Sequence, residues 1–153
     1  MTAAISRRAV DEFLAQKTLA LAGASRRGRK FGNAVLKELT KQGYEVLVVH
    51  PEAAEIDGAP CYRSLAALPK PVGGLVAVVP PSATAQLVAE AAEAGIPRIW
   101  MQQGAESPDA IRSCAEHGID AVHGECILMF AEPAGFVHRA HRWIRKVCGK
   151  LPA

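Results

Sequence analysis

The chain has 153 residues, of which half are apolar and 22% are charged, and its formal net charge is +3. The length predicts one globular domain over residues 1–153 that buries about 70% of its extended-chain surface. A net charge this small does not favour a nucleic-acid partner. No apolar run approaches the roughly 20 residues of a membrane helix, and Asp11 and Glu12 interrupt the region where a signal peptide would be apolar. We therefore expect a cytoplasmic protein with no membrane partner.

The four cysteines of the chain are Cys61, Cys114, Cys126 and Cys148. They form no C-x-x-C pair and no spacing typical of metal ligands. Cysteines of a cytoplasmic protein normally stay reduced. We therefore expect free thiols and no bound metal.

The first part of the chain predicts a helix, a strand, a helix and a strand. The first helix has Ser6 as its N-cap and ends near residue 16. Residues 18–22 are apolar throughout, as in a strand that is covered on both faces. The second helix begins at Phe31, carries apolar residues at every fourth position and ends where a glycine follows. Residues 44–49 predict the second strand.

The middle of the chain carries a weaker signal. Glycine and proline interrupt residues 52–70, where we expect a loop with one helical turn near residues 64–67. Residues 72–79 are apolar and predict the third strand. A helix capped by Ser82 and closed by Gly95 is expected after it.

The last part of the chain predicts two more strands and two more helices. A strand is expected over residues 98–102, and Ser107 with Pro108 is typical of a helix start. The fifth strand is expected over residues 119–123. Apolar residues at helical spacing predict a final helix over about residues 133–147.

Apolar strands that alternate with capped helices indicate an α/β fold. We expect a Rossmann-like three-layer sandwich, with a five-stranded, mainly parallel sheet and helices on both faces. In such sheets the ligand lies outside the carboxyl ends of the strands, where the strand order reverses. The segments expected at that edge are residues 23–33, 50–53, 79–82, 102–105 and 123–126.

The segment 23–33 is the most informative of these. It joins a strand to a helix, and a helix N-terminus favours an anion. Gly23 allows a tight turn, Ala24 keeps side-chain bulk low, and Ser25 adds a hydroxyl donor. The cations of the loop are Arg26, Arg27, Arg29 and Lys30. A phosphate-binding loop is the preferred interpretation, and a plain connection with a solvated basic loop is the alternative.

A nicotinamide dinucleotide is not the ligand that this loop favours. The usual fingerprint is G-x-G-x-x-G, whereas Ser25 stands here where the second glycine would be. An acid usually follows the second strand to hold the ribose hydroxyls, and here Glu52 comes two residues late. A P-loop is excluded, because Arg29 and not Lys follows Gly28.

Five motifs in order resemble the stand-alone coenzyme A-binding domain proteins, which are related to the N-terminal CoA-binding domain of the succinyl-CoA synthetase α subunit. The resemblance spans about residues 18–129. The motifs are Gly23-Ala24-Ser25 with Lys30-Phe31-Gly32-Asn33, Gly43-Tyr44-Glu45-Val46 up to His50-Pro51, Val78-Val79-Pro80-Pro81, Trp100-Met101-Gln102-Gln103-Gly104, and Gly124-Glu125-Cys126-Ile127.

The resemblance implies a site for CoA or an acyl-CoA at the strand ends. The residues that would bind the phosphates are Gly23, Ala24, Ser25, Arg26, Arg27, Gly28, Lys30, Phe31, Gly32 and Asn33. The adenosine would lie by His50, Pro51 and Ala53. The remaining wall of the site would consist of Val79, Pro80, Met101, Gln102 and Gln103. Two positions depart from the family pattern. Many relatives have Asn where this chain has His50, and Ala53 stands where the synthetase has a lysine.

No group of residues predicts catalysis, because the synthetase makes its thioester with groups outside this domain. We therefore expect a binding protein without chemistry of its own. His50 and His123 fall at strand ends and could touch the ligand. Cys126 also falls at the ligand edge, so a mixed disulfide with the CoA thiol is one hypothesis, and packing in the core is the other.

Two other functions remain open. One is an NAD(P)-binding, oxidoreductase-like domain. The other is an interaction module that works through the basic face of the last predicted helix, where Arg142 and Arg145 lie. A homodimer is compatible with CoA binding and with both of these functions, although no residue requires one.

Overall fold

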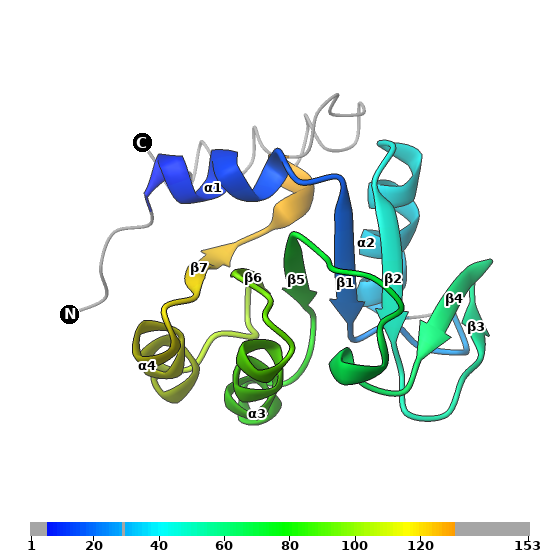
Figure 1. Ribbon diagram of the computed structural model, residues 1–153. Helices are drawn as coiled ribbons and strands as arrows, with labels where there is room; N and C mark the ends of the chain where they lie inside the picture. The colour runs from blue at the N-terminus through cyan, green and yellow to red at the C-terminus, as the bar shows by residue number, and fades with distance from the viewer. Residues whose placement is uncertain (1–5, 29, 131–153) are drawn as a thin grey trace.

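The computed structural model describes residues 6–28 and 30–130, and these form an α/β sandwich around one seven-stranded sheet (Figure 1). The strands are β1 Thr18–Ala22, β2 Glu45–Val49, β3 Glu55–Ile56, β4 Ala59–Tyr62, β5 Gly74–Ala77, β6 Arg98–Gln102 and β7 Asp120–Glu125. The helices are α1 Arg7–Leu14, α2 Phe31–Lys41, α3 Pro81–Glu93 and α4 Pro108–His117, with short 3-10 turns η1 Leu65–Ala67 and η2 Ile127–Met129.

The order of the strands in the sheet is β3-β4-β2-β1-β5-β6-β7. All neighbouring strands run parallel except β3 and β4, which are antiparallel. The chain moves from β1 outward to β2 and to the edge strand β3, returns in β4 between β3 and β2, and then crosses back over β2 and β1 to continue with β5. The strand order therefore reverses between β1 and β5, which is where a ligand crevice is expected.

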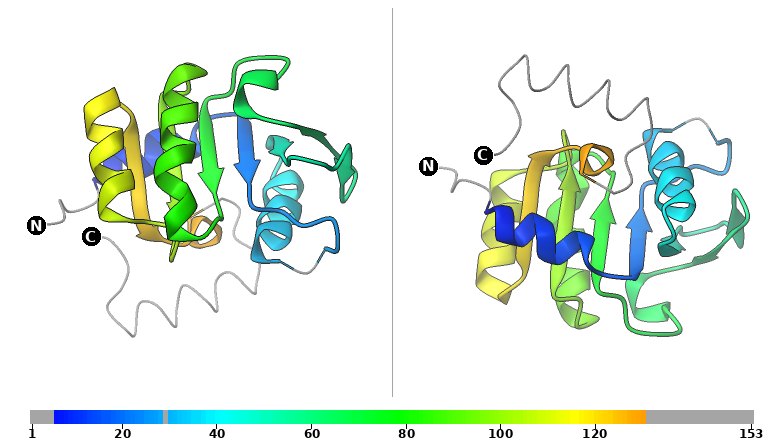
Figure 2. Two further views of the ribbon diagram at one scale, coloured as in Figure 1. Left: turned by 90° about the horizontal axis from the view of Figure 1, so that it is seen from below. Right: turned by 90° about the horizontal axis from the view of Figure 1, so that it is seen from above.

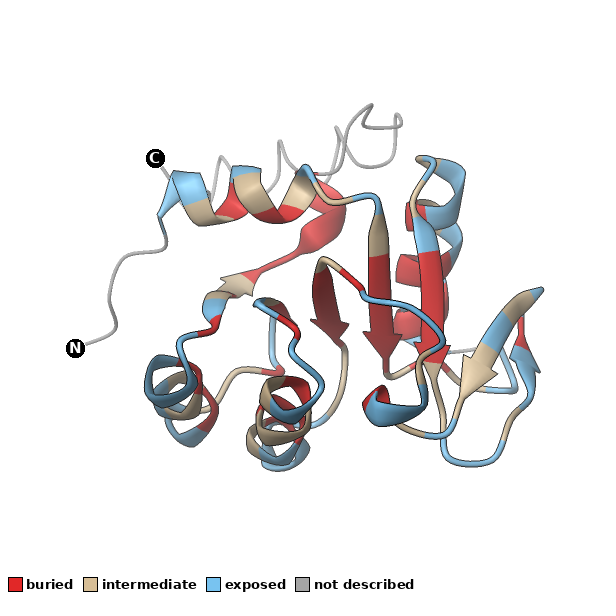
Figure 3. Ribbon diagram, viewed as in Figure 1, coloured by how far each residue is buried: buried red, intermediate tan, exposed pale blue. Residues whose placement is uncertain are grey.

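The two faces of the sheet carry separate hydrophobic cores (Figure 2). Helices α1 and α2 pack on one face together with η2, and α3 and α4 pack on the other. The central strands are buried on both sides, as Figure 3 shows, which is why their sequences are apolar throughout. Trp100 is fully buried in the first core, 5.4 Å from the ring of Phe13 and 5.8 Å from that of Phe130. Helices on both faces confirm the predicted fold class.

The predicted number of strands was wrong, because the sheet has seven strands and not five. The two extra strands, β3 and β4, lie in the segment that was predicted as a loop. They form a hairpin whose two turn residues, Asp57 and Gly58, both have positive φ, +50° and +83°. An Asp-Gly pair is the usual signal of such a turn.

Helix boundaries agree with most of the sequence signals. The hydroxyl of Ser6 accepts a hydrogen bond from the N–H of Ala9, and that of Ser107 accepts one from Ala110. Ser82 was predicted as a cap, but it lies inside α3, which begins at Pro81. Proline fits a first helical position because its missing N–H would be unpaired there anyway.

Other boundaries differ slightly from the predictions. Strand β5 covers only four residues of the predicted range 72–79, and β7 extends two residues past the predicted end. The helix predicted over residues 133–147 lies outside the described residues. Among the residues that the structure describes, no helix is long and apolar enough to cross a membrane.

Candidate functional site

The crevice at the switch point begins with a close contact between two loops. The φ angle of Gly23 is +120°, and a Cβ atom at this position would lie 2.0 Å from the carbonyl oxygen of Val78. A Cβ atom at Gly32 would lie 2.4 Å from the carbonyl oxygen of Gly23. Only glycine therefore lets α2 start directly against the ends of β1 and β5.

The loop between β1 and α2 is held together by its own hydrogen bonds. The Ser25 N–H donates to Oδ1 of Asn33 (2.8 Å), and Nδ2 of Asn33 donates back to the Ser25 carbonyl (2.8 Å). The Arg27 N–H donates to the Ser25 hydroxyl (3.2 Å), and the Gly28 N–H donates to the Ser25 carbonyl (3.1 Å). Three N–H groups of the predicted phosphate loop are thus used inside the loop.

Asn33 also ties this loop to the β3–β4 hairpin. Its Nδ2 atom lies 2.9 Å from Oδ2 of Asp57, and the Asn33 side chain is almost completely buried. The loop after β1, helix α2 and the β3–β4 hairpin therefore meet at the side-chain amide of Asn33. Asp57 was not among the predicted site residues, although the Asp-Gly pair was visible in the sequence.

A cavity of about 860 Å³ lies along α2 beside this amide. Four of the residues predicted to bind phosphate border it: Gly28, Lys30, Phe31 and Asn33. Phe31 is half exposed there. The remaining lining residues are Ala34, Leu36, Lys37, Thr40 and Asp57.

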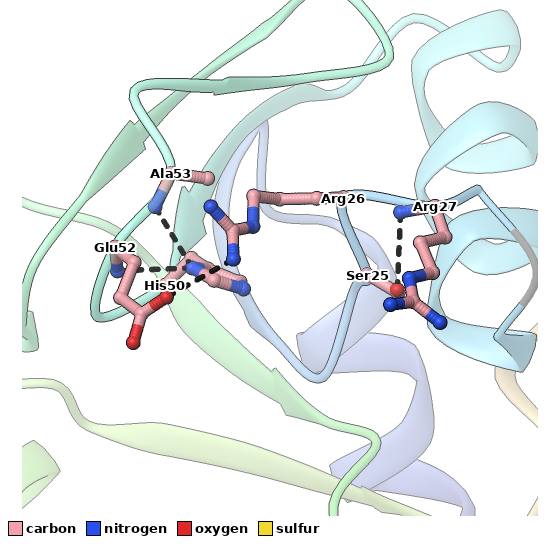
Figure 4. A network of polar contacts seen from close by, with 6 residues as sticks. All are labelled: Ser25, Arg26, Arg27, His50, Glu52 and Ala53. Carbon is pink, nitrogen blue, oxygen red and sulfur yellow. Dashed lines mark hydrogen bonds and ion pairs between the residues drawn. The ribbon is translucent and has the colours of Figure 1, made fainter.

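The turn after β2 lies opposite the cationic loop (Figure 4). Nδ1 of His50 accepts hydrogen bonds from the backbone N–H groups of Glu52 (3.1 Å) and Ala53 (3.0 Å). A ring nitrogen that accepts two hydrogen bonds carries no proton, so the neutral ring has its proton on Nε2. His50 thus closes the turn in the way that an asparagine side chain closes an Asx turn.

The two arginines of the loop point in different directions. Arg26 reaches toward the turn after β2 and places its guanidinium 3.0 Å from the Glu52 carboxylate, while Arg27 turns away from it (Figure 4). Both partners of the ion pair are more than half exposed, at 58% and 68%. The pair shows that segments 23–33 and 50–53 meet, as the sequence predicted. Arg29 lies outside the described residues.

Two of the five residues predicted to form the wall of the site, Met101 and Gln102, are buried. Met101 is fully buried in the second core, and Gln102 is 3% exposed, with its Oε1 accepting from the Ile127 N–H (3.1 Å). Gln102 therefore positions the turn that follows β7. Gln103 and Pro80 are exposed, and Val79 is partly buried.

Cys126 lies in the first core and is 2% exposed. This position fits the packing interpretation and keeps the thiol away from the surface of the crevice. Burial raises the pKa of the Cys114 thiol to about 11, which lowers its reactivity at neutral pH. Cys61, Cys114 and Cys126 are free thiols.

His123 lies at the ligand edge of β7, half buried. Burial lowers the pKa of its ring below the usual 6.5, and the nearby Glu106 carboxylate offsets part of this effect. Among the described residues, no three His, Cys, Asp or Glu side chains gather in a way that could hold a metal ion.

A doubly wound sheet with a cation-rich loop at its switch point places the chain in the Rossmann-like class of α/β proteins. Residues 17–132 match the family model described as CoA binding domain, so the chain belongs to the CoA binding domain family. This confirms the resemblance inferred from the five motifs.

Among the curated proteins, the chain is similar to acetate–CoA ligase [ADP-forming] I of Archaeoglobus fulgidus. The two sequences are 39% identical over 77 residues, which are half of this chain and 11% of the ligase. The chain thus matches only about a tenth of the length of that enzyme.

Two solved structures of small proteins are also similar. A conserved hypothetical protein from Pyrococcus furiosus is 45% identical, with a TM-score of 0.69 over 72% of this chain and 96% of that one. A hypothetical protein from Pyrococcus horikoshii is 29% identical, with a TM-score of 0.76 over 83% of this chain and 92% of that one. The two alignments extend over almost the whole length of both relatives.

Proposed function

We propose that this chain binds coenzyme A or an acyl-CoA in the crevice between the 23–33 loop and the 50–53 turn, and that it acts as a binding protein without chemistry of its own. The observation that carries the proposal is that Arg26, Arg27 and Lys30 gather at the switch point of a CoA binding domain. CoA carries a pyrophosphate and a 3′-phosphate, so it can use several cations at once.

The elements of the crevice suggest a role for each segment. The pyrophosphate would lie against Ser25, Arg27 and Lys30 at the start of α2, where the helix dipole favours an anion. The adenosine would lie by His50 and Ala53. Val79, Pro80 and Gln103 would border the ligand, whereas the buried Met101, Gln102 and Cys126 would support that wall from behind.

We expect a dissociation constant in the micromolar range. Each exposed cation contributes about 1 kcal/mol or less to the binding of a phosphate. The loop uses three of its own N–H groups internally, so side chains would supply much of the recognition. Binding should therefore weaken as the salt concentration rises.

Titration calorimetry with CoA tests the proposal. We expect saturable binding by the natural protein and a loss of about tenfold or more in affinity for the variant Ser25→Ala, Arg26→Ala, Lys30→Ala. The matched control is Ser113→Ala, Arg112→Ala, Lys41→Ala, which removes the same residue types far from the crevice. Absence of binding by the natural protein, or equal losses in both variants, would contradict the proposal.

A further inference from the structure

The ion pair between Arg26 and Glu52 joins two groups that favour different ligands. In dinucleotide-binding Rossmann folds, the residues after the second strand meet the adenosine ribose. An acid there binds free ribose hydroxyls, whereas an arginine accepts a phosphate on the ribose. In this chain the acid, Glu52, comes two residues after the usual place, and its carboxylate lies 3.0 Å from the guanidinium of Arg26 in the loop after β1.

The position of Glu52 is fixed by the fold of its turn. Its backbone N–H donates to Nδ1 of His50, and so does that of Ala53. The turn therefore holds the carboxylate opposite the loop between β1 and α2. Arg26 comes from that loop, whose backbone is tied down through Ser25 and Asn33.

The pair is also weak enough to be exchanged for a ligand. Both side chains are more than half exposed, and an exposed ion pair contributes about 1 kcal/mol or less. A phosphate dianion is a stronger partner for a guanidinium than one carboxylate, because it carries more negative charge and offers three acceptor oxygens. A ribose phosphate can therefore take the place of Glu52 on Arg26.

We infer that Glu52 competes with the 3′-phosphate of the ligand for Arg26, so that this pair sets how strongly the site prefers CoA over dephospho-CoA. The inference rests on the proposed function. In the free protein, Glu52 neutralises Arg26. In the complex, Arg26 binds the 3′-phosphate and the Glu52 carboxylate moves into solvent, where it still repels the phosphate.

Two single variants separate the two halves of the pair. Glu52→Gln frees Arg26 and removes the repulsion, so we expect CoA to bind about two- to fivefold more tightly, while dephospho-CoA, whose free ribose hydroxyls lose a carboxylate partner, gains no affinity. Arg26→Gln removes the phosphate partner, so we expect the ratio of the two dissociation constants to approach one. Neither change touches the backbone hydrogen bonds that close the turn.

Two control variants match these changes. Arg27→Gln removes the same charge from the same loop, but its side chain points away from the turn (Figure 4). It should weaken the binding of CoA and of dephospho-CoA by the same factor and leave the ratio of the two dissociation constants unchanged. Glu45→Gln removes an exposed carboxylate that pairs with Lys70 at the opposite edge of the sheet, and it should change neither affinity.

The test is calorimetric titration of all five proteins with CoA and with dephospho-CoA. A ratio that rises in Glu52→Gln and falls toward one in Arg26→Gln supports the inference. If CoA binds but the ratio stays the same in both variants, or if Glu52→Gln tightens both ligands equally, the inference is overturned and the proposed function stands. If neither ligand binds the natural protein, the proposed function fails and this inference fails with it.

Discussion

At the scale of single residues, the start of α2 depends on Gly23 and Gly32, where backbones touch. Gly23 has a positive φ and also lies where a Cβ atom would collide with the carbonyl oxygen of Val78. Gly43 has a positive φ as well, +99°, but a Cβ atom there would meet nothing within 4 Å. A substitution at Gly43 therefore meets only the strain of a positive φ, whereas one at Gly23 meets this strain and a collision with the backbone as well.

We predict that Gly23→Ala lowers the free energy of unfolding by at least about 3 kcal/mol, because it combines a strained φ with a collision in the backbone. Gly43→Ala should cost only about 1 kcal/mol, the price of the left-handed conformation. Urea denaturation of both variants measures the difference. Equal losses at the two positions would mean that Val78 does not limit the space beside Gly23.

The pKa of His123 gives a prediction for the pH dependence of stability. The unfolded chain takes up this proton near pH 6.5, whereas the folded chain takes it up only at lower pH because the ring is half buried. The free energy of unfolding should therefore decrease as the pH falls below 6.5. His123→Gln cannot take up the proton, so its stability should fall less over that range.

Urea denaturation of the natural protein and of His123→Gln at pH 8, 6.5 and 5.5 checks this sign. At pH 8 the ring is neutral in the folded and the unfolded chain, so the difference in the free energy of unfolding between the two proteins there reports packing alone. At pH 5.5 this difference in the free energy of unfolding should shift in favour of the variant, because the natural protein loses more stability than the variant does. A relative loss of stability at pH 5.5 would show that the folded protein favours the charged ring.

At the scale of elements, Asn33 joins α2, the loop before it and the β3–β4 hairpin. Asn33→Ala leaves the Ser25 N–H and carbonyl without this partner, so we predict a loss of about 2–3 kcal/mol in the free energy of unfolding. The Ser25 amide should also exchange its hydrogen faster. Urea denaturation and hydrogen exchange measure the two effects.

Two variants at the same contact serve as controls. Asn33→Asp still accepts from Ser25, but it places a carboxylate against that of Asp57 and should be less stable than the natural protein. Adding Asp57→Asn restores a donor for that contact and should recover part of the loss. No recovery would mean that the contact between residues 33 and 57 does not hold the hairpin.

The sequence predicted the longer elements well because their signals are local. The central strands are apolar on both faces, and Ser6 and Ser107 cap their helices. The hairpin of β3 and β4 was missed because its strands are only two and four residues long, with a single buried residue between them. Elements this short show no periodicity, so only the Asp57-Gly58 turn could have revealed them.

The candidate site could be predicted only in part. The general rule for doubly wound sheets predicts that the 23–33 loop and the 50–53 turn lie at the same edge of the sheet, and the ion pair between Arg26 and Glu52 joins these segments. The partners of single side chains could not be predicted, because Arg26 and Glu52 are 26 residues apart and Asn33 and Asp57 are 24 apart. Such pairs depend on the final geometry of two loops.

At the scale of the whole molecule, the sheet order places the cations of the 23–33 loop at the switch point of the sheet. The chain crosses from β4 back over β1 to β5, so the loops that follow β1 and β5 lie in close contact beside Gly23. The cations of the loop then face the turn after β2 on one side and the cavity along α2 on the other. A CoA binding domain with this arrangement should discriminate ligands by their phosphates.

A thermal-shift titration with CoA, dephospho-CoA, NAD, NADP and ATP in parallel tests the central claim most directly. A ligand that binds only the folded protein, present at a hundred times its dissociation constant, adds about 2.7 kcal/mol to the free energy of unfolding. For a chain of this size, Tm then rises by several degrees. We predict this rise for CoA and a smaller one for dephospho-CoA at the same concentration. A rise with NAD alone, or no rise with any of the five, would contradict the account.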